Sequence, residues 1–318
     1  MIFTITGYMG SGKTTICDIL SREYNFRRVH AGGIFRQLGL EKNISVLDMT
    51  KELTAKGDSE VDRIIDQKMI EEFNNVKDNE NVIFDSRLAW HFLDKSKTFN
   101  IFIVVSPYQA ATRTYLTRKS EDESYDTLEE AIDALVERRV LENKRYKAIY
   151  GVNCEDLNNY DLVIDTSYIN ALEASEIIMD CYKKKTLNQP YEKLWISPEF
   201  VFPTMSIDRI NKEKVDGYLD RIYRHESLEQ VELIRIHDAL FIKDGHNRIV
   251  AYNLAKIRLF NPRIVLSEDD VDSEGNVVKK ALSITEQDIL DWENMNGFIY
   301  NYRPKIIQKM SRNNNANS

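Results

Sequence analysis

Short apolar runs alternate with helix-like patterns through the first half of the chain. Such runs, four or more residues long and bounded by polar residues, are typical of buried parallel strands. The runs that fit are Ile2–Thr6, Arg28–Ala31, Asn81–Asp85, Ile101–Ser106 and Asp161–Thr166. Because strands that alternate with helices build a sheet covered on both faces, the pattern predicts a three-layer parallel α/β domain.

Helix boundaries support this prediction. Ser59 can cap a helix that runs through Phe73. Thr127 to Glu130 form a capping-box sequence, and the helix that follows ends at Tyr150 before Gly151. Serine and threonine are favoured just before a helix and glycine just after one, so the sequence predicts where these helices begin and end.

The chain is long enough for two domains. The α/β domain is expected to span residues 1–183, and the lysine-rich stretch 184–190 is expected to be a linker. A smaller α+β domain with aromatic strand-like stretches is expected over 191–310, including a helix near Lys212 to Arg224. The asparagine-rich tail at 311–318 is expected to be disordered.

Composition narrows the class of protein. The net charge of −8 argues against a protein that coats nucleic acid by bulk electrostatics, although a local basic groove stays open. The three cysteines lack CxxC spacing, so no structural metal is expected. No apolar run approaches the roughly 20 residues of a membrane span, and no signal peptide is seen. We expect a cytoplasmic protein, bacterial or from a phage-infected cell.

The segment from Gly7 to Thr14 carries the pattern GxxxxGK[ST] between a strand and an amphipathic helix. Glycines let the backbone N–H groups of such a loop turn toward phosphate, and the helix dipole adds to the attraction. Lys13 would reach the β- and γ-phosphates of ATP, and the Thr14 hydroxyl would ligate Mg²⁺. The expected ATP-binding residues are Gly7, Gly10, Ser11, Gly12, Lys13, Thr14 and Thr15.

Three further motifs follow this loop in order, at residues 30–36, 81–87 and 145–151. With them, the chain resembles the nucleoside monophosphate kinases, and most closely the archaeal type of cytidylate kinase, over residues 1 to about 182. The resemblance implies that Arg36 holds the phosphate of the acceptor and Arg87 the acceptor nucleotide. It also implies a lid at about 108–150, with arginines that close over the transferring group: Arg118, Arg138 and Arg145.

Arginine suits these roles because its planar guanidinium grips phosphate oxygens in a fixed geometry. Each arginine could instead be a surface ion-pair partner. Four other cations of the lid are expected to be solvated or supporting charges: Arg113, Lys119, Arg139 and Lys144.

Asp85 lies at the carboxyl end of a predicted strand, where ligands of α/β proteins bind. It could orient a Mg²⁺-bound water, bind the acceptor, act as a general base or cap the helix that follows. The role of base matters only for a hydroxyl acceptor, since a phosphate acceptor is already deprotonated.

The chain departs from the family pattern on the acceptor side. Gly33 stands where an aspartate is usual, Asp85 and Ser86 where glutamate and glycine are usual, and Leu141 where a lid serine is common. The ATP side is intact. Kinase activity is therefore better supported than the identity of the acceptor.

The second domain contains a strand followed by the turn Gly245-His246-Asn247-Arg248. This sequence resembles the ParB/sulfiredoxin superfamily, which implies a nucleotide-phosphate site at Gly245, His246 and Arg248. A helix start with a surface arginine is the plain alternative.

Three functions are compatible with these features. The first is a kinase for a free pyrimidine nucleotide such as CMP or dCMP. The second is a kinase for a hydroxymethylpyrimidine, such as 5-hydroxymethyluracil, within DNA in a phage base-modification pathway, with Asp85 as the base. The third is a nucleotide-sensing partition or regulatory protein that binds DNA, which the arginines on the acceptor side disfavour.

Overall fold

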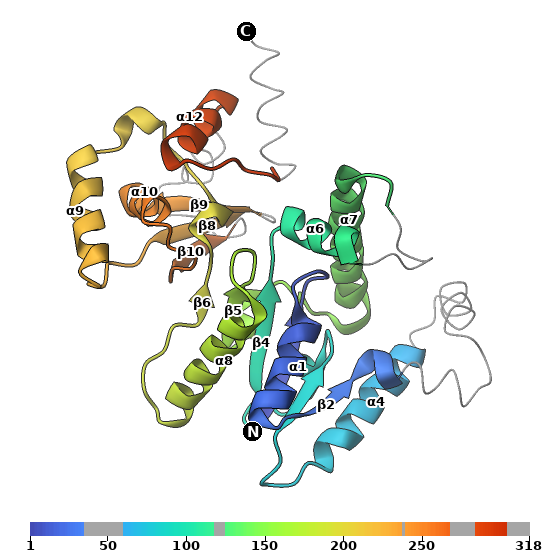
Figure 1. The fold of residues 1–318 in the computed structure, drawn as a ribbon. Helices are drawn as coiled ribbons and strands as arrows, with labels where there is room; N and C mark the ends of the chain where they lie inside the picture. Colours follow the sequence, from blue (N-terminus) through green and yellow to red (C-terminus); the bar gives the residue numbers. More distant parts are fainter. Residues whose placement is uncertain (35–59, 118–124, 237–238, 268–283, 304–318) are drawn as a thin grey trace. The chain divides into compact units, whose positions relative to one another are not determined.

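The computed structural model describes residues 1–34, 60–117, 125–236, 239–267 and 284–303 (Figure 1). The chain divides into two compact units, Met1–Lys193 and Leu194–Ser318. Several positions singled out in the sequence lie outside the described residues: Arg36, Ser59, Arg118, Lys119 and the tail at 311–318.

Five strands of the first unit are parallel neighbours in one sheet. In the order β2-β3-β1-β4-β5, they span Arg27–His30, Val82–Asp85, Ile2–Gly7, Phe99–Val104 and Leu162–Asp165. The predicted parallel α/β fold is thereby confirmed. Because the strands are parallel, their carboxyl ends share one edge of the sheet, where Gly7 and Asp85 both lie.

Strand β4 begins two residues earlier than the sequence predicts. The polar Asn100 lies just before the predicted strand, yet it is buried within the sheet. Its side-chain oxygen accepts a hydrogen bond of 2.7 Å from the hydroxyl of Thr4 on the adjacent β1. Because this bond satisfies the buried amide, a polar residue is tolerated in the strand interior.

The helices of the first unit have well-defined ends. Their bounds are Lys13–Tyr24 for α1, Glu60–Asn74 for α4, Ala89–Phe92 for α5, Pro107–Thr117 for α6, Leu128–Tyr150 for α7 and Ala171–Thr186 for α8, with a 3-10 turn at Leu157–Asn159. The hydroxyl of Thr127 accepts from Glu130 N at 3.1 Å, and α7 ends at Gly151 as expected. The capping box is only half formed, because the Glu130 carboxylate accepts from Asp126 N instead.

The predicted linker is wrong at its start. Lys183, Lys184 and Lys185 belong to the last turn of α8. Lys184 pairs with Asp180 at 2.6 Å, and Lys185 pairs with Asp161 at 2.7 Å. Cations near a helix C-terminus interact favourably with the helix dipole, so a lysine run extends this helix rather than ending it.

The second unit has a four-stranded sheet in the order β10-β8-β9-β7. Strands β8 and β9 are antiparallel, whereas β7 and β10 run parallel to their neighbours. The elements are β6 (Leu194–Trp195), β7 (Val201–Phe202), α9 (Lys212–Tyr223), β8 (Glu232–Ile236), β9 (Ala239–Asp244), α10 (His246–Leu254), β10 (Arg263–Ser267) and α12 (Glu286–Asn296), with 3-10 turns at Pro198–Phe200 and Ile207–Arg209.

In the described part of the chain, no helix has both the length and the apolar character needed to cross a bilayer. Within the same residues, no cluster of three or more His, Cys, Asp or Glu side chains could hold a metal ion. The cysteines Cys17, Cys154 and Cys181 are buried free thiols.

Candidate active site

The turn between β1 and α1 has a backbone that favours glycine at two positions. Gly10 and Gly12 have φ angles of +73° and +78°, in the left-handed region. A Cβ atom on Gly10 would lie 2.7 Å from the carbonyl oxygen of Ala110 on α6. A larger residue at Gly10 would therefore be both strained and blocked.

Side chains from other elements hold the carbonyl groups of this turn. Arg113 of α6 donates to Gly10 O at 3.2 Å and to Thr166 O at 2.6 Å. The Thr166 hydroxyl donates to Ser11 O at 2.9 Å, and Arg87 donates to Gly7 O. Arg113 is thus a supporting charge, one of the two roles expected for it. Because side chains bind the carbonyl oxygens of Gly7, Gly10 and Ser11, N–H groups of the turn can donate to a ligand.

Among the described residues, the N-terminus of α1 has no side-chain cap. The Ser11 hydroxyl is buried without a hydrogen-bond partner in the same part of the chain. The first N–H groups of a helix have no acceptor within it and carry partial positive charge. Thr14 and Thr15, in the first turn of α1, are exposed. This arrangement fits a phosphate group, with a threonine hydroxyl free to approach a cation.

Asp85 lies opposite the loop at the end of β3. Its carboxylate is 1% exposed and forms ion pairs with Lys13 of α1 and Arg28 of β2. Arg28 Nε donates to Asp85 Oδ2 at 3.0 Å. Burial lowers the pKa of Lys13 to about 8, with nearby Arg87 and Arg28 adding to the effect and Cys17 opposing it.

His30 completes the surroundings of Asp85. Its Nδ1 accepts from Gly33 N at 2.8 Å, so in the neutral imidazole the proton is on Nε2, which lies 3.6 Å from Asp85 Oδ2. Arg28 and His30 were not assigned roles from the sequence. Both occupy one face of β2, and the register pairs His30 with Asp85. Two polar residues at i and i+2, on one face of the short strand β2, are the signal that could have revealed them.

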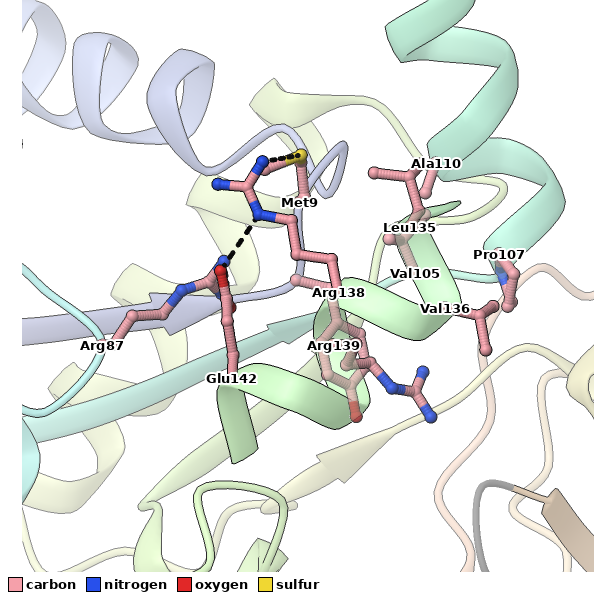
Figure 2. A pocket seen from close by; sticks show the side chains of 11 residues that line it. Met9, Arg87, Val105, Pro107, Ala110, Leu135, Val136, Arg138, Arg139 and Glu142 are labelled. Carbon is pink, nitrogen blue, oxygen red and sulfur yellow. Dashed lines mark hydrogen bonds and ion pairs between the residues drawn. The ribbon is translucent and has the colours of Figure 1, made fainter. Parts of the chain in front are cut away.

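A pocket lies between the loop and α7. Its polar side is an arginine–glutamate–arginine group (Figure 2). Glu142 pairs with Arg87 at 3.1 Å and with Arg138 at 3.2 Å, and Arg138 also lies 3.7 Å from the sulfur of Met9. One carboxylate therefore occupies the space between two guanidinium groups.

The rest of the pocket is mainly apolar. Arg139 stacks over the ring of Tyr8, with 4.4 Å from its Cζ to the ring centroid, and pairs with Glu155 at 2.9 Å. A flat apolar group with an anionic end would match both sides of this pocket. The remaining lining residues are Val105, Pro107, Ala110, Leu135 and Val136.

Arg145 contacts α4. It pairs with Asp62 of α4, and one turn later Tyr150 donates to Asp66 at 2.7 Å. The structure thus gathers Lys13, Asp85, Arg87 and Arg138 near the loop, whereas it pairs Arg145 with α4.

In the second unit, the predicted strand–turn–helix is formed by β9, Gly245 and α10, and Gly245 has a φ of +108°. The side chains of the turn have internal partners. Arg248 donates to Glu229 O at 2.8 Å, to Gln230 O at 2.9 Å and to the Asp244 carboxylate. His246 Nε2 accepts from Thr204 N at 3.1 Å. A phosphate role for His246 and Arg248 stays a prediction, and a ligand would have to replace these bonds.

A glycine loop with an uncapped helix N-terminus, on the edge of a parallel sheet, defines the class: the first unit is a P-loop phosphotransferase. The chain belongs to the cytidylate kinase-like family, whose sequence pattern matches residues 2–168.

Individual relatives agree with the family. A cytidylate kinase from Methanosphaera stadtmanae is 32% identical over 185 residues, which cover 58% of this chain and 99% of the relative. A cytidylate kinase from Methanocaldococcus jannaschii is 36% identical over 168 residues, 52% of this chain and 89% of that protein. The chain is also 31% identical over 181 residues to an S-adenosylmethionine-dependent nucleotide dehydratase from Lacinutrix mariniflava, 57% of this chain but 36% of that protein.

His246 gives a pH-dependence to stability. Burial lowers its pKa to about 4 from 6.5, and Asp244 opposes the shift. The unfolded chain takes up a proton below pH 6.5, whereas the folded unit does so only near pH 4. The contribution of neutral His246 to the stability of the folded state is therefore complete above pH 6.5 and is lost as the pH falls toward 4.

Between pH 7 and pH 4.5 the free energy of unfolding should fall by about 2 to 3 kcal/mol more in the wild type than in His246→Gln. Urea titrations at both pH values measure this difference by intrinsic tryptophan fluorescence, to which Trp292 contributes from a ring 6.0 Å from that of His246. An equal fall in the free energy of unfolding in the wild type and in His246→Gln would contradict the lowered pKa of His246.

Proposed function

We propose that the chain is an ATP-dependent kinase that transfers the γ-phosphate to a pyrimidine nucleotide such as CMP or dCMP. The observation that carries this proposal is that Lys13 and Arg87 both lie at the phosphate loop. Lys13 is the residue expected to bind the donor, and Arg87 is the residue expected to bind the acceptor. The Arg87 guanidinium donates to the carbonyl of Gly7, the first residue of the loop. The family match over both sides of this site supports the same reading.

On the donor side, the loop from Gly7 to Thr15 would hold the phosphates of ATP. Lys13 would leave Asp85 for the β- and γ-phosphates, and the exposed Thr14 hydroxyl would hold Mg²⁺. Bound Mg²⁺ neutralises phosphate charge. The protein contributes alignment and electrostatic stabilisation, which are what phosphoryl transfer chiefly requires.

On the acceptor side, the pocket of Figure 2 would take the nucleotide. Glu142 presents a carboxylate to Arg87 and Arg138, and an acceptor phosphate would take its place. The apolar wall and the Tyr8 ring would then contact the base. Arg36, Arg118 and Arg145 remain proposed members of this site from the family resemblance.

Labelled ATP with CMP, dCMP, UMP and hydroxymethyluracil-containing DNA, offered in parallel, tests the proposal. Label should appear in CMP or dCMP, and Lys13→Ala should lower transfer by at least about 100-fold, because it removes a cation from the transferring phosphate. Lys97→Ala is the matched control, since Lys97 is a 66% exposed lysine of the same unit.

Label in DNA and none in mononucleotides would overturn the nucleotide acceptor. Transfer that survives in Lys13→Ala would overturn the assignment of the loop.

A second candidate is transfer to the hydroxymethyl group of a pyrimidine base within DNA. The buried Asp85 carboxylate favours it, because a hydroxyl acceptor needs a base and a phosphate acceptor does not. Asp85 would take the hydroxyl proton while the oxygen attacks the γ-phosphorus and ADP leaves. The second unit, which lies beyond the family match and resembles the ParB/sulfiredoxin superfamily, would hold the strand.

Asp85→Asn separates the two candidates. The amide keeps the shape of the side chain but cannot accept the proton. Transfer to a hydroxyl should slow by about 100-fold or more, whereas ATP binding stays largely intact. The rate of transfer at saturating ATP measures the effect, and an unchanged rate to hydroxymethyluracil DNA would reject the role of base.

A further inference from the structure

Asp85 forms an ion pair with Arg28 as well as with Lys13, the cation assigned to the phosphates. Arg28 is on β2, the strand next to Asp85, and its side chain is 19% exposed. Its Nε and Nη2 both donate to Asp85 Oδ2, and its Nη1 lies 3.1 Å from the carboxylate of Asp18 on α1. Arg28 therefore links the carboxylate to the helix that follows the phosphate loop.

The cations around Asp85 are divided between its two oxygens. Lys13 contacts Oδ1. Arg28 contacts Oδ2, and His30 Nε2 lies 3.6 Å from the same oxygen. Because the two partners do not share an oxygen, Lys13 can leave without disturbing the contacts of Arg28.

A buried carboxylate that loses its only partner is strongly destabilised. Asp85 is 1% exposed with Lys13 in place, so if Lys13 moves to the phosphates of ATP, the carboxylate must keep another cation. Arg28 meets this need: two of its N–H groups fix the orientation of the carboxylate, and Asp18 holds its third nitrogen. A lysine at position 28 could not provide the paired contact.

We propose that Arg28 is a positioning residue that holds Asp85 by Oδ2, while Lys13 moves between Oδ1 and the phosphates of a nucleoside triphosphate. Nucleotide binding then exposes Oδ1 alone, on the side from which Lys13 departs. The inference rests on the proposed function only in taking a nucleoside triphosphate as the donor. It requires neither candidate acceptor.

A double-mutant cycle in nucleotide affinity tests this inference without a transfer assay. A non-hydrolysable ATP analogue with Mg²⁺ is titrated calorimetrically into the wild type, Arg28→Met, Asp85→Asn and the double variant. Arg28→Met should weaken binding by at least about 10-fold, because withdrawal of Lys13 would leave Asp85 without its arginine. In the Asp85→Asn background the same change should cost less than about 2-fold.

Arg27→Met is the matched control, and its affinity should stay within about 2-fold of the wild type. Arg27 precedes Arg28 on the same strand but is 42% exposed and pairs with Glu72 and Glu80. If Arg28→Met does not fold, Arg28→Lys replaces it in the cycle, with a smaller loss, about 3-fold, that also vanishes in the Asp85→Asn background.

The outcomes are distinct. An equal loss in both backgrounds would mean that Arg28 acts through general structure, and no loss in either would mean that Asp85 does not depend on it. Either result overturns the inference while leaving the kinase proposal in place. A wild type that does not bind the analogue would overturn the donor assignment, and with it this inference.

Discussion

The buried charge of Asp85 is the constraint on which the rest of the candidate site depends. A carboxylate that is 1% exposed requires cations at close range, and here they come from two different elements, α1 and β2. Their side chains tie the helix after the phosphate loop and the edge strand of the sheet to the end of β3. The same pairs set where Lys13 rests before a nucleotide arrives.

Charges elsewhere near the loop are paired in the same way. Glu142 lies between Arg87 and Arg138, while Arg113 and Thr166 hold the outward-facing carbonyls of the loop. The oxygens of a phosphate ligand would replace the Glu142 carboxylate as the partner of Arg87 and Arg138, so the ligand would not bind to unpaired cations. Such an arrangement keeps the guanidinium groups oriented, so that less order must be imposed on binding.

Local features could be predicted from the sequence, whereas long-range pairing could not. The strands, the phosphate loop and the Thr127 and Gly151 helix ends depend on residues within a few positions of one another. The partners of Asp85 depend on which strand lies beside β3, so Arg28 and His30 went unassigned. For the same reason the contacts of Glu142 were not predicted. The predicted strand begins just after Asn100, which lies inside β4 in the fold.

In the second unit, the predicted strand–turn–helix forms, but burial gives His246 and Arg248 internal partners that their sequence context does not reveal.

A crystal structure of the full chain with Mg²⁺ and a non-hydrolysable ATP analogue would show whether Lys13 leaves Asp85 for the donor phosphates while Arg28 stays. We expect Lys13 Nζ within hydrogen-bond distance of a β- or γ-phosphate oxygen, with the Arg28 guanidinium still on Oδ2 of Asp85. A bound nucleotide with Lys13 still on Oδ1, or with Arg28 moved away from Oδ2, would contradict this expectation.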